Sequence, residues 1–212
     1  RFCPSEINED IPFNQLHFPV PKKFDFFSRR KALINNHKLS EIYDNYQKGG
    51  DRTIIVIPSM TFEEECLGGI YGISEYESRN LWEILRADCP RTKIIYCSIK
   101  KTSELQINHL LDSANVSNET RKRIKFVHAG SFVKVNSLKP LSRVILEDNN
   151  FLNELKSLVV NNETYLETFV STGPELELAK KLNIPVWWGH PKLEYYKTKS
   201  GNRHLFDQKG IP

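Results

Sequence analysis

The sequence predicts an α/β protein: a three-layer, Rossmann-like open parallel sheet with helices on both faces, preceded by a helical N-terminal arm. The segment Ile54–Ile57 is a β-branched run without polar alternation, which is typical of a strand covered by helices on both faces. Further strand-sized apolar runs alternate with helical patterns, as right-handed strand–helix–strand crossovers require. No internal repeat or low-complexity tract interrupts this alternation.

Residues 1–50 differ from the rest of the chain in proline content and in hydrophobic periodicity. Residues 1–23 hold four of the eleven prolines and show little periodicity, so we expect an extended arm. Phe24–Gln47 has a helical pattern with a possible break at residues 35–37, and Tyr43 is among its expected inward positions. A Gly-Gly-Asp turn at 49–51 then leads into the first strand. We therefore separate an N-terminal arm and helical segment, 1–50, from an α/β domain, 51–197.

The elements after the first strand follow from apolar stripes, caps and breakers. A helix is expected over Tyr76–Asp88, because Leu81, Ile84 and Leu85 form one stripe and Pro90 follows. Capping-box patterns at Ser103–Gln106 and Thr172–Glu175 predict two more helix starts. The other expected elements are strands Lys93–Ser98, Ile124–His128, Thr164–Val170 and Ile184–Trp188, and helices after Ser117 and Pro140 and over Phe151–Val160, Pro174–Leu182 and Gly201–Lys209.

Composition narrows the class of partner. The net charge of +4 is mild and the charges are interleaved, so we expect no nucleic acid and no membrane as partners. The four cysteines show no metal-ligand spacing and are interpreted as reduced thiols, which predicts a cytoplasmic location. The first residues contain neither an initiator Met nor a signal-peptide core, and we expect the chain to be a piece of a longer protein.

The sequence places a candidate site after the first strand. Pro58 cannot donate to a sheet ladder, so the strand should end there and a loop should leave its carboxyl end. Ligands of open α/β sheets gather outside these carboxyl ends. We therefore expect the loop Ser59–Ser74 and the helix start Tyr76–Arg79 to line any site.

Three polar segments have both a functional and a structural interpretation. Glu77 and Arg79 either contact a ligand or serve the helix dipole and surface salt bridges. Ser171-Thr172 either holds an anion at a helix start or caps that helix. Lys199 and Arg203 open the last helix, where cations oppose the dipole, so they either offset an anion or form a solvated basic turn.

Common cofactor motifs are not found. Gly68-Gly69-x-x-Gly72 lies ten residues beyond the strand and has the wrong spacing for a dinucleotide fingerprint. The six histidines show no ligand spacing, so we expect no metal site. Trp187-Trp188 is interpreted as core and interface packing.

Several segments together resemble one family. They are the Ile-Pro-Ser strand end at 57–59, Tyr76-Glu77-Ser78-Arg79, the second strand from Pro90, Thr172 to Pro185, and the closing segment Thr198 to Pro212. From Asp51 onward the chain is similar to the N-terminal, pre-ATP-grasp domain of ATP-grasp carboxylate–amine or peptide ligase-like proteins. Two positions depart from the family pattern: Ser78 replaces the second Glu of Tyr-Glu-Glu-Arg, and Asn202 replaces a Ser.

The resemblance implies a substrate-side domain of a ligase that joins a carboxylate to an amine through an acyl phosphate, using ATP and Mg²⁺. It implies that 198–212 leads into a downstream ATP-grasp domain that binds most of the ATP and Mg²⁺, and that this fragment alone is not catalytic. The site residues implied are Ser59, Tyr76, Glu77, Arg79, Ser171 and Thr172 for substrate, and Lys199 and Arg203 for ATP.

Two alternatives stay open. ATP-grasp-like regions also occur in scaffold proteins that carry calmodulin-binding IQ motifs, which predicts a non-catalytic module with protein partners. A free-standing nucleotide-sugar or dinucleotide-binding domain would require a phosphate loop near the first strand, and we find none in the sequence.

Overall fold

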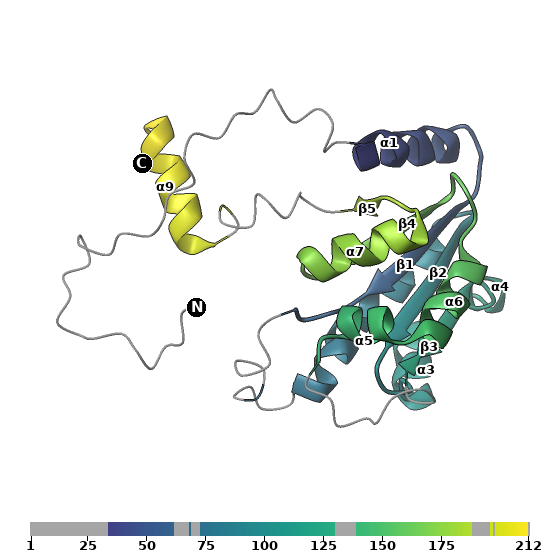
Figure 1. Cartoon of the computed structure of the whole chain (residues 1–212). Helices are drawn as coiled ribbons and strands as arrows, with labels where there is room; N and C mark the ends of the chain where they lie inside the picture. The colour runs from purple at the N-terminus through teal and green to yellow at the C-terminus, as the bar shows by residue number, and fades with distance from the viewer. Residues whose placement is uncertain are drawn as a thin grey trace. The chain divides into compact units, whose positions relative to one another are not determined.

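The central element is a five-stranded, all-parallel sheet (Figure 1). The computed structural model describes residues 34–61, 68, 73–129, 139–187, 196 and 198–211. Its strands are β1 (Arg52–Ile57), β2 (Thr92–Ser98), β3 (Ile124–His128), β4 (Thr164–Thr168) and β5 (Val186–Trp187). The predicted α/β class with an open parallel sheet is confirmed.

The strand order β3-β2-β1-β4-β5 gives the sheet one point where the winding direction reverses. The chain winds from β1 through β2 to β3 on one side, then crosses to β4 on the other side of β1. In the register, Val56 of β1 pairs with Tyr96 of β2 and with Glu167 of β4. The crevice between the carboxyl ends of β1 and β4 is therefore the topological switch point, where such sheets bind ligands.

Helices cover both faces of the sheet, as the sequence predicts. Alternate residues of β1 point to opposite faces, so Ile55 and Ile57 join one core cluster and Ile54 and Val56 join the other. The first cluster contains residues of α5 (Leu141–Glu147), α6 (Asn149–Leu158) and α7 (Gly173–Leu182). The second contains residues of α1 (Ile34–Gln47), η4 (Ile73–Asp88) and α3 (Glu104–Ser113). The described part also contains α4 (Asn118–Arg121) and α9 (Lys199–Lys209).

The helix η4 is a 3₁₀ helix, and it begins three residues before the predicted Tyr76. A 3₁₀ helix has about three residues per turn, so side chains three apart stand above one another. The buried residues Leu81, Ile84 and Ala87 follow this spacing and pack onto the sheet. The same geometry aligns a polar row, Asn80, Glu83 and Arg86, beside that apolar one.

The structure contains one of the two predicted capping boxes, the one at the start of α7, and lacks the one at the start of α3. In α7, the Glu175 carboxylate accepts a 2.8 Å hydrogen bond from the Thr172 backbone N–H and another from its hydroxyl. At α3, Ser103 occupies the cap position with extended backbone, but its side chain makes no capping hydrogen bond. The short helix α4 is capped by Ser117, which accepts from the Thr120 N–H.

Several predictions near the edges of the fold need correction. The helix α1 runs without a break through residues 35–37, and Tyr43 is 53% exposed rather than inward-facing. Trp187 is 45% exposed, so it is not a core residue as predicted, and its one ring contact among the described residues is with Tyr165. Its neighbour Trp188 lies outside the described residues. The predicted arm at 1–23, the predicted helical residues 24–33, and residues 62–67 and 69–72 of the predicted loop lie outside the described residues.

The chain divides into two compact units, Arg1–Ile34 and Asn35–Pro212, so most of α1 belongs to the second unit. Cys89 is an exposed free thiol and Cys97 a buried one, and burial raises the Cys97 pKa. None of the described helices has the length and apolar character needed to cross a bilayer.

Candidate functional site

A pocket of about 430 Å³ lies at the switch point, a volume within the usual range of small-molecule sites. We call it the switch-point pocket. Its lining residues come from η4 and from the carboxyl ends of β1 and β4 with the residues that follow them. The described residues that line it are Val56, Pro58, Asn80, Trp82, Glu83, Glu167, Thr168 and Phe169.

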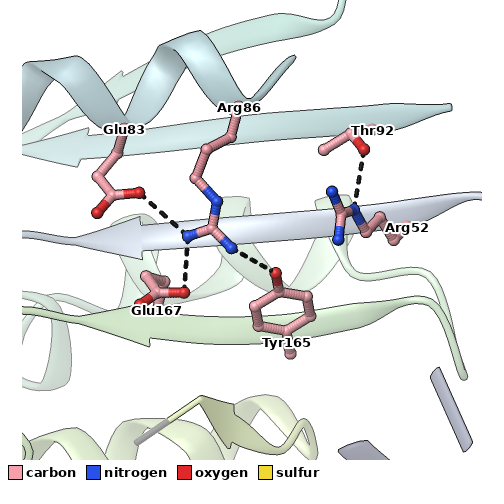
Figure 2. A network of polar contacts seen from close by, with 6 residues as sticks. All are labelled: Arg52, Glu83, Arg86, Thr92, Tyr165 and Glu167. Carbon is pink, nitrogen blue, oxygen red and sulfur yellow. Dashed lines mark hydrogen bonds and ion pairs between the residues drawn. The ribbon is translucent and has the colours of Figure 1, made fainter. Parts of the chain in front are cut away.

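The two carboxylates of the pocket are held by one guanidinium. Arg86 Nη1 donates to Glu83 Oε2 at 3.0 Å and to Glu167 Oε2 at 2.8 Å, while Nη2 donates to the Tyr165 hydroxyl at 2.9 Å. Figure 2 shows Arg86 reaching from its helix across β1 to these two side chains of β4. The network thus ties η4 to the neighbouring strand β4 and fixes the orientation of both acids.

Burial changes the titration of this network. Loss of solvent raises the pKa of Glu167, and the hydrogen bond and charge of Arg86 oppose that shift without cancelling it. Burial lowers the pKa of Arg86, but its bond to Glu167 and the nearby charges outweigh this and raise it above its ordinary value. Arg86 therefore stays charged, and Glu167 is a partly buried carboxyl of perturbed pKa in a pocket, a feature enriched at functional sites.

The pocket also offers groups with no protein partner. The amide nitrogen of Asn80 is buried and has no hydrogen-bond partner in the part of the chain that the structure describes. Within those same residues, the Oε1 atoms of Glu83 and Glu167 also make no hydrogen bond. Trp82 and Phe169 are large aromatic side chains that remain 54% and 41% exposed at the pocket. An unpaired buried donor such as the Asn80 nitrogen is costly, whereas the two Oε1 atoms are not buried and can accept from a ligand in the pocket.

The predicted segment Tyr76–Arg79 lies next to this pocket through one aromatic contact. The Tyr76 ring packs edge-on against Phe169 with centroids 5.3 Å apart, and the Arg79 guanidinium lies 5.5 Å from the Tyr76 ring centre. Glu77 turns toward β2 instead, where its carboxylate accepts a 2.7 Å hydrogen bond from the Ile99 backbone N–H. Glu77 therefore anchors η4 to the end of β2.

The predicted residues Ser59 and Thr172 meet in a second feature, a buried polar cluster that we call the Ser59 cluster. Ser59 Oγ lies 2.9 Å from Thr61 Oγ1 and 3.0 Å from Ser142 Oγ, and it accepts from the Ser142 N–H. The Thr61 hydroxyl donates to Glu175, whose other oxygen holds the Thr172 N–H. The cluster therefore joins the end of β1 to the starts of α5 and α7.

This cluster bears on the expected anion site at Ser171-Thr172. The Thr172 N–H is bonded to the internal carboxylate of Glu175, and both Ser171 and Glu175 are buried. The internal carboxylate occupies one of the donors that we expected an external anion to use. The capping interpretation therefore has direct contacts in the structure.

Lys199 and Arg203 lie on α9. They are four residues apart, so their side chains are neighbours on one helical face. Both are exposed, and neither forms an ion pair with any residue that the structure describes. Thr198 caps the helix by accepting from the Gly201 N–H at 3.0 Å. An exposed pair of cations at a helix start can hold an anionic group.

The sequence did not identify Asn80, Trp82, Glu83, Arg86, Tyr165 and Glu167 as site residues. One local signal existed, the i,i+3 spacing of Glu83 and Arg86 on a predicted helix. In the part of the chain that the structure describes, no group of three or more His, Cys, Asp or Glu side chains is placed to hold a metal ion.

These features define a class: an open, doubly wound α/β domain with an acid-lined pocket at its switch point. A scan against protein-family models finds no match. The chain is similar to IQ motif-containing protein H of Danio rerio, with 20% identity over 201 residues, 88% of this chain. The chain spans only 18% of the length of that relative.

Proposed function

We propose that the chain is the substrate-side α/β domain of a longer, cytoplasmic ATP-grasp ligase-like protein, which joins a carboxylate to an amine with Mg-ATP. The observation that carries the proposal is the switch-point pocket with its unpaired polar groups. Two carboxylates line it and share the single cation of Arg86, so the group keeps an excess of acid that suits the amine reactant. The sequence resemblance supplies the reaction class. Tyr76 of the resembling motif packs against the pocket residue Phe169, and Arg79 lies beside the Tyr76 ring.

ATP would bind mainly in a downstream domain. Lys199 and Arg203 are the residues of this chain that would hold its phosphate oxygens, because they form an exposed cation pair on one helical face. Bound Mg-ATP supplies the phosphoryl group that activates the carboxylate. The role of this domain is then to orient the amine and to close one side of the cleft.

Calorimetry of Mg-ATP binding to the full-length parent tests the proposal. We expect Lys199→Ala/Arg203→Ala to weaken binding about tenfold, roughly 1.4 kcal/mol. Lys209→Ala, at the other end of the same helix, is the matched control and should leave the affinity unchanged. A parent protein that binds no ATP would contradict the ligase proposal.

A second candidate is a non-catalytic scaffold module, and one observation favours it. The relative with 20% identity is named for an IQ motif. An IQ motif is the segment through which scaffold proteins with ATP-grasp-like regions bind calmodulin. In that case the parent would lack ATP binding and would instead have protein partners. The same calorimetric experiment separates the two candidates.

A further inference from the structure

A second, smaller pocket lies on the α1 side of the sheet, and it has the opposite electrostatic character. Its volume is about 180 Å³, enough for one aromatic ring, since a cavity of about 150 Å³ holds benzene. The described residues that line it are Leu39, Ile42, Tyr43, Tyr46, Arg52, Arg86, Tyr165 and Trp187. Two guanidinium groups and no acidic side chain are among them.

Arg52 presents hydrogen-bond donors to this pocket. Its Nε donates to Thr92 Oγ1 at 2.9 Å, and its guanidinium carbon lies 4.1 Å from the Tyr46 ring centre (Figure 2 shows the Thr92 bond). These two contacts fix the plane of the guanidinium. Its terminal nitrogens have no hydrogen-bond partner in the described part of the chain. A fixed guanidinium with open donors matches the planar geometry of a carboxylate.

Tyr165 adds a neutral donor beside Arg52. Its oxygen accepts from Arg86 Nη2, and its own proton has no acceptor among the residues described. Burial raises the Tyr165 pKa to about 12, so the hydroxyl keeps its proton at neutral pH. Arg86 itself is committed to Glu83, Glu167 and Tyr165, so its charge is largely compensated. Arg52 is thus the main uncompensated charge of the pocket.

Two of the aromatic lining residues are exposed to solvent. Tyr43 on α1 and Trp187 on the edge strand β5 are both about half exposed, and the Trp187 ring lies 5.9 Å from that of Tyr165. Such rings pack well against a flat apolar body while the charged group lies deeper. An apolar ring with one anionic end fits these two halves of the pocket.

We propose that this pocket binds a small aromatic carboxylate, with the ring between Tyr43 and Trp187 and the carboxylate on Arg52 and the Tyr165 hydroxyl. This site is separate from the switch-point pocket and does not depend on the function proposed above. The Arg86 network forms a shared wall, because Arg86 and Tyr165 line the second pocket while Glu83 and Glu167 line the first.

Isothermal calorimetry with benzoate tests this proposal on the 212-residue chain. We expect saturable binding of one benzoate, and binding of the neutral analogue benzamide weaker by about tenfold or more, because it lacks the charge-assisted bonds. Arg52→Met should lose about tenfold in benzoate affinity. Arg121→Met, which removes an arginine paired with Asp112 elsewhere, is the matched control and should bind benzoate as the wild type does.

A second variant keeps the test decisive if Arg52→Met perturbs folding. Tyr43→Ala removes a half-exposed side chain, so the fold should be retained while benzoate affinity falls about threefold. Equal affinities for benzoate and benzamide would overturn the proposal. So would unchanged benzoate binding in both variants, or no saturable binding at millimolar concentrations.

Phenyl phosphate provides a final comparison. A planar carboxylate matches the fork of one arginine, whereas a tetrahedral phosphate carries more charge and more oxygens. We expect benzoate to bind at least as tightly as phenyl phosphate in this small pocket. Binding of phenyl phosphate alone would overturn the carboxylate assignment.

Discussion

Replacing Arg86 by Met is expected to lower the free energy of unfolding by about 3 kcal/mol. The substitution leaves Glu83 and Glu167 close together without their shared cation, and removing one member of a buried ionic network typically costs about 3–5 kcal/mol. The lower end applies because the Arg86 side chain is 28% exposed. Urea denaturation of the 212-residue chain, followed by circular dichroism, measures the change.

Two controls separate the network from a general effect of losing a cation. Lys122→Met removes one end of the exposed Lys122–Glu119 pair and should change stability by less than about 0.5 kcal/mol. The triple variant Arg86→Met/Glu83→Gln/Glu167→Gln should recover part of the loss, because no unpaired charge remains. An Arg86→Met protein as stable as the wild type would show that these contacts between η4 and β4 do not stabilise the fold.

Replacing Glu175 by Ala is expected to cost about 3 kcal/mol as well. Its carboxylate accepts from the Thr172 N–H, the Thr172 hydroxyl and the Thr61 hydroxyl, and the side chain is fully buried. Each buried donor left without an acceptor costs about 1–3 kcal/mol, and α7 also loses its cap. The loss should appear as a lower urea midpoint with an unchanged m-value.

Glu177→Ala is the matched control on the same helix. Glu177 pairs with Lys181 on the exposed side of α7, so its removal should change stability by less than about 0.5 kcal/mol. Similar losses in the two variants would mean that the Ser59 cluster does not stabilise the carboxyl edge of the sheet. Glu175→Gln should lie between them, since the amide keeps one acceptor oxygen.

The sheet could be predicted from the sequence because its signals are local. Short β-branched runs separated by capped helices define the strands, and Ile124–His128 was predicted with its observed bounds. The carboxyl end of β1 could also be placed, because Pro58 marks it. These features depend on neighbours within a few residues, which one sequence contains.

The switch-point pocket could be predicted only in part. Glu167 and Arg86 are 81 residues apart in the chain, and they meet because β4 pairs with β1 rather than with β3. Successive side chains of a strand point to opposite faces of the sheet, so Tyr165 and Glu167, two residues apart on β4, lie on the same face. No local sequence pattern shows which strands pair. The side chains that η4 and β4 bring together in the pocket could therefore be identified only from the structure.

The central claim is that the switch-point pocket binds the amine reactant, and Trp82 allows a direct measurement. Trp187→Phe/Trp188→Phe leaves Trp82 as the one tryptophan, since the chain has three. Titration with 1,4-diaminobutane should then change the Trp82 fluorescence saturably, while 1,4-butanediol should not, and Glu83→Gln/Glu167→Gln should abolish the response. A Trp82 signal that stays constant, or that responds equally to the uncharged diol, would contradict the claim.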